Sequence, residues 1–182
     1  RRIATASSSP NGAFHIAWRD SDGNGRGGAR DSGNGEYWLF SGESEVLSGE
    51  LERPKQGTVA DNGSFVLEDW LFTSELRSIL YAFTADGSPI LKKTFAANLY
   101  RSAISPDGRY VVCHTAASSH PKDSNALIMF SAYSGKELWR IRPPFACKSF
   151  DFQSEPGILT LVPHEPLTHY PMLSCRLAIP PP

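Results

Sequence analysis

The sequence predicts an all-β fold made of repeated four-stranded units. Three observations carry this prediction. A four-residue turn rich in Ser, Pro, Asn, Asp and Gly recurs four times, a short apolar run follows each turn, and a hairpin pattern follows three of them. The 15 glycines and 14 prolines among 182 residues are typical of many short strands joined by turns rather than of long helices.

The recurring turn has a clear physical basis. Pro presets φ at the second turn position, Asn or Asp tolerates a left-handed backbone, and Gly takes a positive φ without a Cβ clash. The four turns are at residues 9–12, 60–63, 105–108 and 154–157, and their glycines lie 51, 45 and 49 residues apart. This near-constant spacing indicates an internal repeat.

Each turn leads into a short run of β-branched and aromatic residues. These runs lie at residues 14–18, 65–67, 110–112 and 158–162. They are too short for helices and have the composition of strands.

A hairpin pattern recurs further along each of the first three units. Its paired apolar runs are at residues 37–40 and 45–47, 79–83 and 89–91, and 127–130 and 137–139. Gly or Asp-Gly between two apolar runs is a strong hairpin signal. Phe40, Phe83 and Phe130 lie 43 and 47 residues apart, so the hairpins reproduce the period of the turns independently.

Each unit therefore contains two turn-linked strands and a hairpin. Four strands in about 45–50 residues is the size of one blade of a β-propeller. We expect one β-propeller-like domain over residues 1–182, with complete blades at about 3–55, 56–96 and 97–144 and a partial fourth blade at 145–179.

Two stretches of the third unit resemble known repeats. The turn Ser105-Pro106-Asp107-Gly108-Arg109-Tyr110 and the hairpin stretch Gly135-Lys136-Glu137-Leu138-Trp139 are similar to motifs of WD-repeat and TolB-type propellers. The first resembles the turn of an inner strand, and the second resembles an outer hairpin. The resemblance implies a propeller fold over nearly the whole chain, and it implies no particular activity.

The partial fourth blade predicts that something completes the structure. Propellers generally have at least four blades, and an unclosed end leaves strand edges with unpaired amides. Three arrangements would remove the open edge. Two copies could pair, the chain could be a segment of a longer one, or a four-bladed ring could close with a shortened last blade.

Composition excludes several classes of partner. The 18 basic and 19 acidic residues give a net charge of −1, so charge predicts neither a nucleic-acid partner nor an anionic membrane partner. No stretch approaches 18 consecutive apolar residues, so no membrane span is predicted. Three cysteines, Cys113, Cys147 and Cys175, fit neither a full disulfide framework nor a zinc pattern, which favours a reducing compartment such as the cytoplasm.

The sharpest local motif predicts a calcium loop in the first unit. EF-hand-type loops place oxygen ligands at the first, third, fifth, seventh and twelfth positions, with glycine at the sixth. The residues at the ligand positions are Asp20, Asp22, Asn24, Arg26 through its carbonyl, and Asp31. Arg26 and Arg30 place positive charge beside the predicted ion, and a glycine-rich solvent loop explains the same composition. No other cofactor is predicted.

Other reactive residues do not form a catalytic pattern. The five histidines, His15, His114, His120, His164 and His169, meet no zinc spacing. Cys113 lies in an apolar strand and is predicted to be inert. Glu68 and Asp69 are strand neighbours that face opposite ways, so they are not predicted to act as an acid/base pair. We therefore predict no catalysis by this chain.

The four tryptophans are expected in strands, packed between blades, where large flat side chains fill the widening gap. They are Trp18, Trp38, Trp70 and Trp139.

The function predicted from the sequence is a non-catalytic interaction module or scaffold that binds a protein partner or a second copy of itself. Long loops at residues 20–36 and 116–125 would form much of its variable surface. The alternatives are a propeller domain associated with a hydrolase, and a propeller that binds a ligand in a calcium-dependent way.

Overall fold

The computed structural model describes residues 4–21, 33–71, 73–153, 157–163 and 175–180. Strands and turns make up this described part of the chain, which contains no α-helix and therefore no helix that could span a membrane. Fifteen strands form four antiparallel sheets. The all-β prediction is confirmed.

The sheets are numbered here in chain order. Sheet 1 contains β1 (Thr5–Ser8), β2 (Phe14–Arg19), β3 (Gly35–Ser41) and β4 (Ser44–Leu51). Sheet 2 contains β5 (Pro54–Val59), β6 (Phe65–Asp69), β7 (Ser78–Phe83) and β8 (Pro89–Phe95). Sheet 3 contains β9 (Leu99–Ile104), β10 (Tyr110–Thr115), β11 (Leu127–Ser131) and β12 (Glu137–Ile141). Sheet 4 contains β13 (Cys147–Gln153), β14 (Ile158–Pro163) and β15 (Cys175–Ala178).

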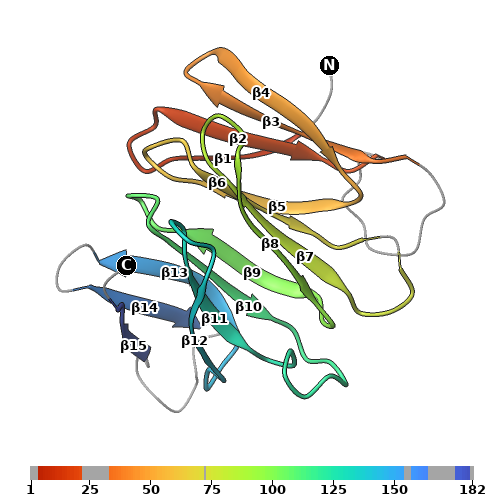
Figure 1. The fold of residues 1–182 in the computed structure, drawn as a ribbon, viewed down its shortest axis with the longest axis vertical. Coiled ribbons are helices and arrows are strands. Elements are labelled where there is room, and N and C mark those ends of the chain that lie inside the picture. The colour runs from red at the N-terminus through yellow and green to blue at the C-terminus, as the bar shows by residue number, and fades with distance from the viewer. Residues whose placement is uncertain (1–3, 22–32, 72, 154–156, 164–174, 181–182) are drawn as a thin grey trace.

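The sheets stack in the order of the chain. Within each sheet, every strand pairs with the next one along the sequence. Figure 1 shows sheets 1 to 4 following one another, with sheet 1 and sheet 4 at opposite ends of the stack. The first strands β1, β5, β9 and β13 contact one another in succession. Three four-stranded blades and a three-stranded fourth blade thus form a β-propeller-like fold, as predicted.

Apolar side chains fill the three spaces between successive sheets. Ile16, Leu39 and Phe65 lie in the core between sheets 1 and 2. A second core lies between sheets 2 and 3, and a third between sheets 3 and 4. Sheets 2 and 3 are therefore covered on both faces. Accordingly, every residue of β6 and of β10 is buried.

The turns that open the second strands differ by one residue between blades. The amide of Ser9 donates to the carbonyl of Phe14, five residues on, whereas the amide of Ala60 donates to the carbonyl of Ser64, four residues on. The Ser9 hydroxyl also accepts a hydrogen bond from the Phe14 amide at 3.0 Å. Ala60 has no hydroxyl to extend its turn in this way. Phe65 consequently occupies the place of His15, not that of Phe14.

Candidate functional site

One face of sheet 1 is not covered by any described sheet. Its side chains come from β2 and β3, which pair His15 with Phe40 and Ala17 with Trp38, and Arg19 follows on the same face. Their neighbours Ile16 and Leu39 point the other way, into the core with sheet 2. We call His15, Ala17, Arg19, Trp38 and Phe40 the open face; all five are half-buried.

The corresponding positions in the next two sheets pack on the sheet before them. In sheet 2 these positions are the pairs Phe65–Phe83 and Leu67–Tyr81, which lie in the core shared with sheet 1. In sheet 3 they are the pairs Val111–Phe130 and Cys113–Ile128, which lie in the core shared with sheet 2. The open face is therefore the blade-packing face of sheet 1, and no described residues form the sheet that would pack on it.

The open face has an aromatic centre and a charged border. The Arg19 guanidinium lies 6.0 Å from the centre of the Trp38 ring and forms an ion pair with Glu36. The Ser8 hydroxyl and His15 Nδ1 are 2.8 Å apart, so they share a hydrogen bond. Large aromatic groups and arginine at the centre of a patch, with polar groups around them, are typical of protein–protein interfaces.

At the opposite end of the stack, no described sheet covers the outer face of sheet 4. In sheet 4, Phe152, Leu159 and Leu177 pack toward sheet 3, so the alternate residues of β14 face away from it. Ile158, Thr160 and Val162 are half-buried there, and the buried Thr160 hydroxyl has no hydrogen-bond partner among the described residues. Sheet 4 lies at the end of the stack opposite sheet 1 in Figure 1.

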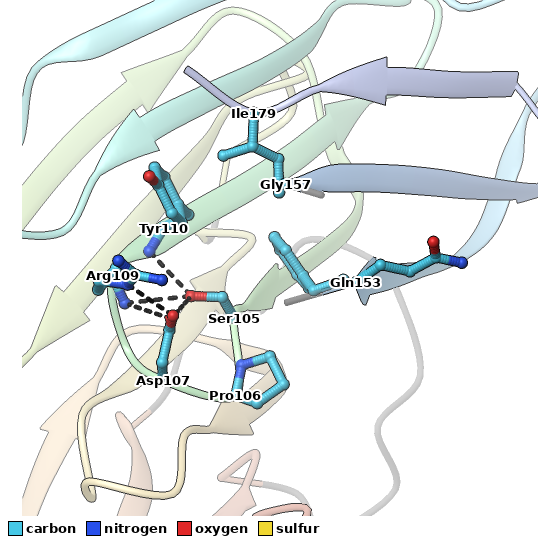
Figure 2. Close-up of a pocket in the computed structure, with 9 residues that line it drawn as sticks. Ser105, Pro106, Asp107, Arg109, Tyr110, Gln153, Gly157 and Ile179 are labelled. Carbon is cyan, nitrogen blue, oxygen red and sulfur yellow. Dashed lines mark hydrogen bonds and ion pairs between the residues drawn. The ribbon is translucent and has the colours of Figure 1, made fainter. Parts of the chain in front are cut away.

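A small pocket lies at the seam between sheets 3 and 4, beside the third turn. Figure 2 shows Ser105, Asp107, Arg109 and Tyr110 on one side of it and Gly157 on the other. The pocket volume is about 60 Å³, whereas clefts for small-molecule ligands usually measure roughly 300–1,000 Å³. It has room for a few water molecules and not for a substrate.

The polar groups of this pocket are already paired with one another. Ser105 Oγ donates to Asp107 Oδ1 at 2.6 Å and accepts from the Tyr110 amide at 3.0 Å. Arg109 Nε donates to Asp107 Oδ2 at 2.6 Å, as the dashed lines in Figure 2 show. The Tyr110 hydroxyl donates to the carbonyl of Pro180 at 2.9 Å. These bonds stabilise the turn and leave little free capacity for chemistry.

A buried polar network connects sheets 2 and 3. Ser102 Oγ donates to Glu68 Oε1 at 2.7 Å, and Arg101 Nη1 donates to Gln56 Oε1 at 2.8 Å. Burial raises the pKa of Glu68 from the ordinary 4.5 to about 7, despite the opposing effects of the Ser102 hydrogen bond and the Arg101 charge. The sequence offered no local signal for this buried carboxyl group, because its partner lies 34 residues away in another blade.

The carboxyl group of Asp69 serves a different purpose from that of Glu68. It accepts hydrogen bonds from the backbone amides of Arg53 at 2.7 Å and of Glu52 and Leu71 at 3.2 Å. Burial raises its pKa, and these hydrogen bonds oppose the shift. The two neighbouring carboxyl groups have separate partners, so they do not form an acid/base pair.

Of the predicted calcium ligands, Asp20 alone lies within the described residues. Asp20 is buried, and its carboxylate accepts a hydrogen bond from the Ser21 amide at 2.7 Å and lies 3.5 Å from Arg53 Nε. Asp22, Asn24, Arg26 and Asp31 lie outside the described residues. The calcium site stays a prediction.

Cys113 and His114 are neighbours on strand β10, and their side chains lie on opposite faces of sheet 3. Cys113 packs between sheets 2 and 3, and burial raises the pKa of its thiol well above the usual value. A thiol of this kind is a poor nucleophile. His114 Nδ1 accepts a weak hydrogen bond from the Cys147 amide at 3.4 Å. Within the described residues, no three His, Cys, Asp or Glu side chains are placed to hold a metal ion.

The tryptophans divide between core and surface. Trp18 is buried between sheets 1 and 2, and Trp139 packs at the core between sheets 3 and 4. Trp38 lies on the open face instead. Trp70 directly follows β6 rather than lying in a strand, and its Nε1 donates to the carbonyl of Leu99 at 3.1 Å.

Comparisons with known proteins find likeness in structure and not in sequence. No protein-family model matches the chain, and no curated protein sequence matches it. Three of the solved structures that match it are a crystal structure of HIRA residues 644–1017, hydrazine synthase of Kuenenia stuttgartiensis, and a complex of KlAtg21 with the coiled coil of AgAtg16.

These likenesses establish the fold alone. The HIRA match has a TM-score of 0.58 at 13% identity and covers 88% of this chain and 47% of that chain. The hydrazine synthase match has a TM-score of 0.53 at 13% identity and covers 86% and 48%. The KlAtg21 match has a TM-score of 0.54 at 11% identity and covers 70% and 44%. The chain thus spans a little under half the length of the solved structures that it matches.

Proposed function

We propose that this chain is a non-catalytic protein-interaction module of the WD-repeat or TolB-like kind, and that it associates through the open face of sheet 1. The observation that carries the proposal is the position of Trp38 and Phe40. They occupy the sites that Tyr81 and Phe83 use to pack on the preceding blade. A face built for blade packing favours another β-sheet blade as its partner.

The partner that we propose is a second copy of the same chain. The uncovered face of sheet 4 corresponds to the side on which sheets 1, 2 and 3 each receive the next blade. It would continue the stack onto the open face of another copy. In a dimer with a twofold axis, the open face of each copy would pack on the sheet 4 face of the other. These two contacts would close a ring of eight blades.

Charges on the two faces also suit each other. The open face carries Arg19 and Glu36, and β4 beside it carries Glu50. The face of sheet 4 carries Asp151 of β13 and Arg176 of β15. Both lie opposite Thr160 of β14 in the strand register. Both faces offer one cation and at least one anion, so opposite charges can meet at the border of the interface.

Sedimentation velocity of the wild-type chain tests this proposal. The expected mass is twice 20.0 kDa. Trp38→Asp places an unpaired charge at the centre of the interface and should weaken dimerisation roughly 30-fold or more. Tyr133→Asp is the matched control, because Tyr133 is 75% exposed in the turn between β11 and β12. A folded wild-type monomer at all concentrations, or a Trp38→Asp variant that dimerises as tightly as wild type, would refute self-association.

A further inference from the structure

A basic groove lies at the opposite end of sheet 3 from the third turn, between the loop at 116–125 and strand β12. Its volume is about 270 Å³, close to the lower end of the roughly 300–1,000 Å³ usual for ligand clefts. The lining residues are Pro121, Lys122, Ala126, Arg140, Ile141 and Arg142. Three of these six side chains are cationic and none is acidic.

The structure holds the two guanidinium groups of this groove in place. Arg140 Nε and Nη2 each donate to the Glu137 carboxylate at 2.9 Å, and Nη1 donates to the carbonyl of Lys122 at 3.1 Å. Arg142 Nη2 donates to the carbonyl of Pro121 at 2.9 Å. An arginine that is already oriented loses less conformational entropy when it binds an anion.

The loop that forms one wall of the groove is itself anchored. Asp123 Oδ2 accepts a hydrogen bond from the Ala96 amide at 2.9 Å, and Asp123 Oδ1 lies 3.3 Å from Arg140 Nη1. The Thr115 hydroxyl donates to the carbonyl of Asp123 and accepts from the Ala126 amide at 2.9 Å. The wall therefore has a defined position relative to β12.

The local charges leave an excess of positive charge in the groove. Glu137 and Asp123 both pair with Arg140. Lys122 and Arg142 form no ion pair with a described carboxylate, and both are exposed. His120 lies 3.4 Å from the carboxylate of Asp123 and adds a further charge when it is protonated. Counting Glu137 and Asp123 against the three lining cations leaves a net charge of +1, and Lys122 and Arg142 are the cations available to an anionic ligand.

We propose that this groove binds a phosphate monoester in its dianionic form. The Arg142 guanidinium can donate two parallel hydrogen bonds to phosphate oxygens, and Lys122 supplies a point charge. Pro121, which is exposed, and Ile141, which is half-buried, offer an apolar surface for the group that carries the phosphate. This proposal is independent of self-association, since no residue of the groove belongs to the open face.

Isothermal titration calorimetry with O-phosphoserine, serine and inorganic phosphate tests the proposal. O-Phosphoserine should bind at pH 7.5, and serine should not. Binding by a His120→Gln variant should weaken at pH 5, because the second pKa of a phosphate monoester is about 6 and the ligand then carries one charge fewer, while this variant gains no imidazolium charge beside the groove. Inorganic phosphate that binds as tightly as O-phosphoserine would assign the site to the free anion and overturn the monoester claim.

Two substitutions in the groove provide the structural test. Arg142→Gln and Lys122→Gln should each weaken O-phosphoserine binding roughly tenfold, the loss expected for one charge-assisted contact. Lys136→Gln is the control, since Lys136 is exposed in the β11–β12 turn outside the groove. Melting temperatures identify any variant that fails to fold. The proposal is overturned if wild type shows no binding at ligand concentrations of about 10 mM, or if folded Arg142→Gln and Lys122→Gln bind as wild type does.

Discussion

Glu68 of strand β6 accepts a hydrogen bond from the hydroxyl of Ser102 in strand β9 at 2.7 Å, and both side chains are buried where blade 2 meets blade 3. Among the described residues, the positive charges of Arg101 and Lys55 favour the ionised form of Glu68. These charges lower the pKa of Glu68 by less than burial raises it. The bond joins two blades through a carboxyl group that is half-protonated near neutral pH.

The first prediction is that Glu68 makes the stability of the fold depend on pH. Its pKa is about 7 in the folded chain against an ordinary 4.5, so the folded state binds the proton more tightly. The resulting stabilisation is complete below pH 4.5 and is lost as pH rises to about 7, by about 3 kcal/mol in total. Glu68→Gln, which stays neutral, should gain stability relative to wild type over that range in urea unfolding.

Glu45→Gln is the control for the loss of one negative charge, because Glu45 is exposed on β4. If the difference in unfolding free energy between Glu68→Gln and wild type is the same at pH 4.5 and pH 8, Glu68 titrates as an exposed carboxylate would, and the assigned burial effect is wrong.

The second prediction concerns His114, whose effect has the opposite sign. Burial lowers its pKa from 6.5 to about 4, so the folded state favours the neutral ring. Its stabilising contribution is complete above pH 6.5 and is lost as pH falls to about 4, by about 3 kcal/mol in total. His114→Phe keeps an aromatic ring beside Tyr100. The rings of Tyr100 and His114 meet edge to face, with their centroids 5.7 Å apart.

His114→Phe should therefore lose less stability than wild type between pH 6.5 and pH 4, as measured by urea unfolding. Its stability at pH 7 should fall, since the Cys147 amide loses its acceptor. A variant whose stability falls with acid as steeply as that of wild type would show that the acid sensitivity arises elsewhere.

The repeat could be predicted from the sequence because its signals are local. Turns such as 105–108 require particular residue types at fixed positions, and Phe83 and Phe130 mark hairpins at the same period. Local signals could not predict which residues of β6, the second strand of sheet 2, face sheet 1 and which face sheet 3. Aligning the turn glycines places Phe65 with Phe14, but the shorter turn at Ala60 moves Phe65 to the opposite face.

The buried polar groups were also beyond a local reading. Glu68 and Asp69 could be assigned to opposite faces by strand alternation alone. Their hydrogen-bond partners depend on how the blades pack. Ser102, the partner of Glu68, lies in the next blade, and the Arg53 amide, a partner of Asp69, lies in the segment between β4 and β5. The basic groove combines Lys122 of a loop with Arg142, 20 residues later, and no spacing rule connects them.

The third prediction tests the calcium loop. If Asp20, Asp22, Asn24, the Arg26 carbonyl and Asp31 bind calcium, millimolar calcium should raise the melting temperature, because a ligand that binds only the folded state stabilises it. Asp22→Ala should abolish the increase. Magnesium at the same concentration controls for ionic strength. An unchanged melting temperature in millimolar calcium would exclude a site at this loop of functional strength.

The fourth prediction separates two consequences of glycine in the blade turns. Gly12 and Gly63 both have a positive φ, +73° and +81°. A Cβ at Gly12 would meet nothing within 4 Å, whereas a Cβ at Gly63 would lie 2.8 Å from the Ala85 Cβ and 2.9 Å from the Phe14 ring. Gly12→Ala should cost only the backbone strain of about 1–2 kcal/mol. Gly63→Ala should cost about 1–3 kcal/mol more, because Phe14 must shift at the packed seam between blades 1 and 2.

Urea unfolding of both variants measures the difference between their losses of unfolding free energy. The cost of a positive φ is common to both variants and cancels in this difference. The two glycines occupy the same place in successive repeats, so a surplus cost at Gly63 reports its contacts with Ala85 of the same blade and Phe14 of blade 1, and not the turn itself. Equal costs would mean that the seam yields to an added methyl group. Because the open face of sheet 1 is the same kind of blade-packing surface, a stiff seam at Gly63 would also imply that a partner blade must match Trp38 and Phe40 closely in shape.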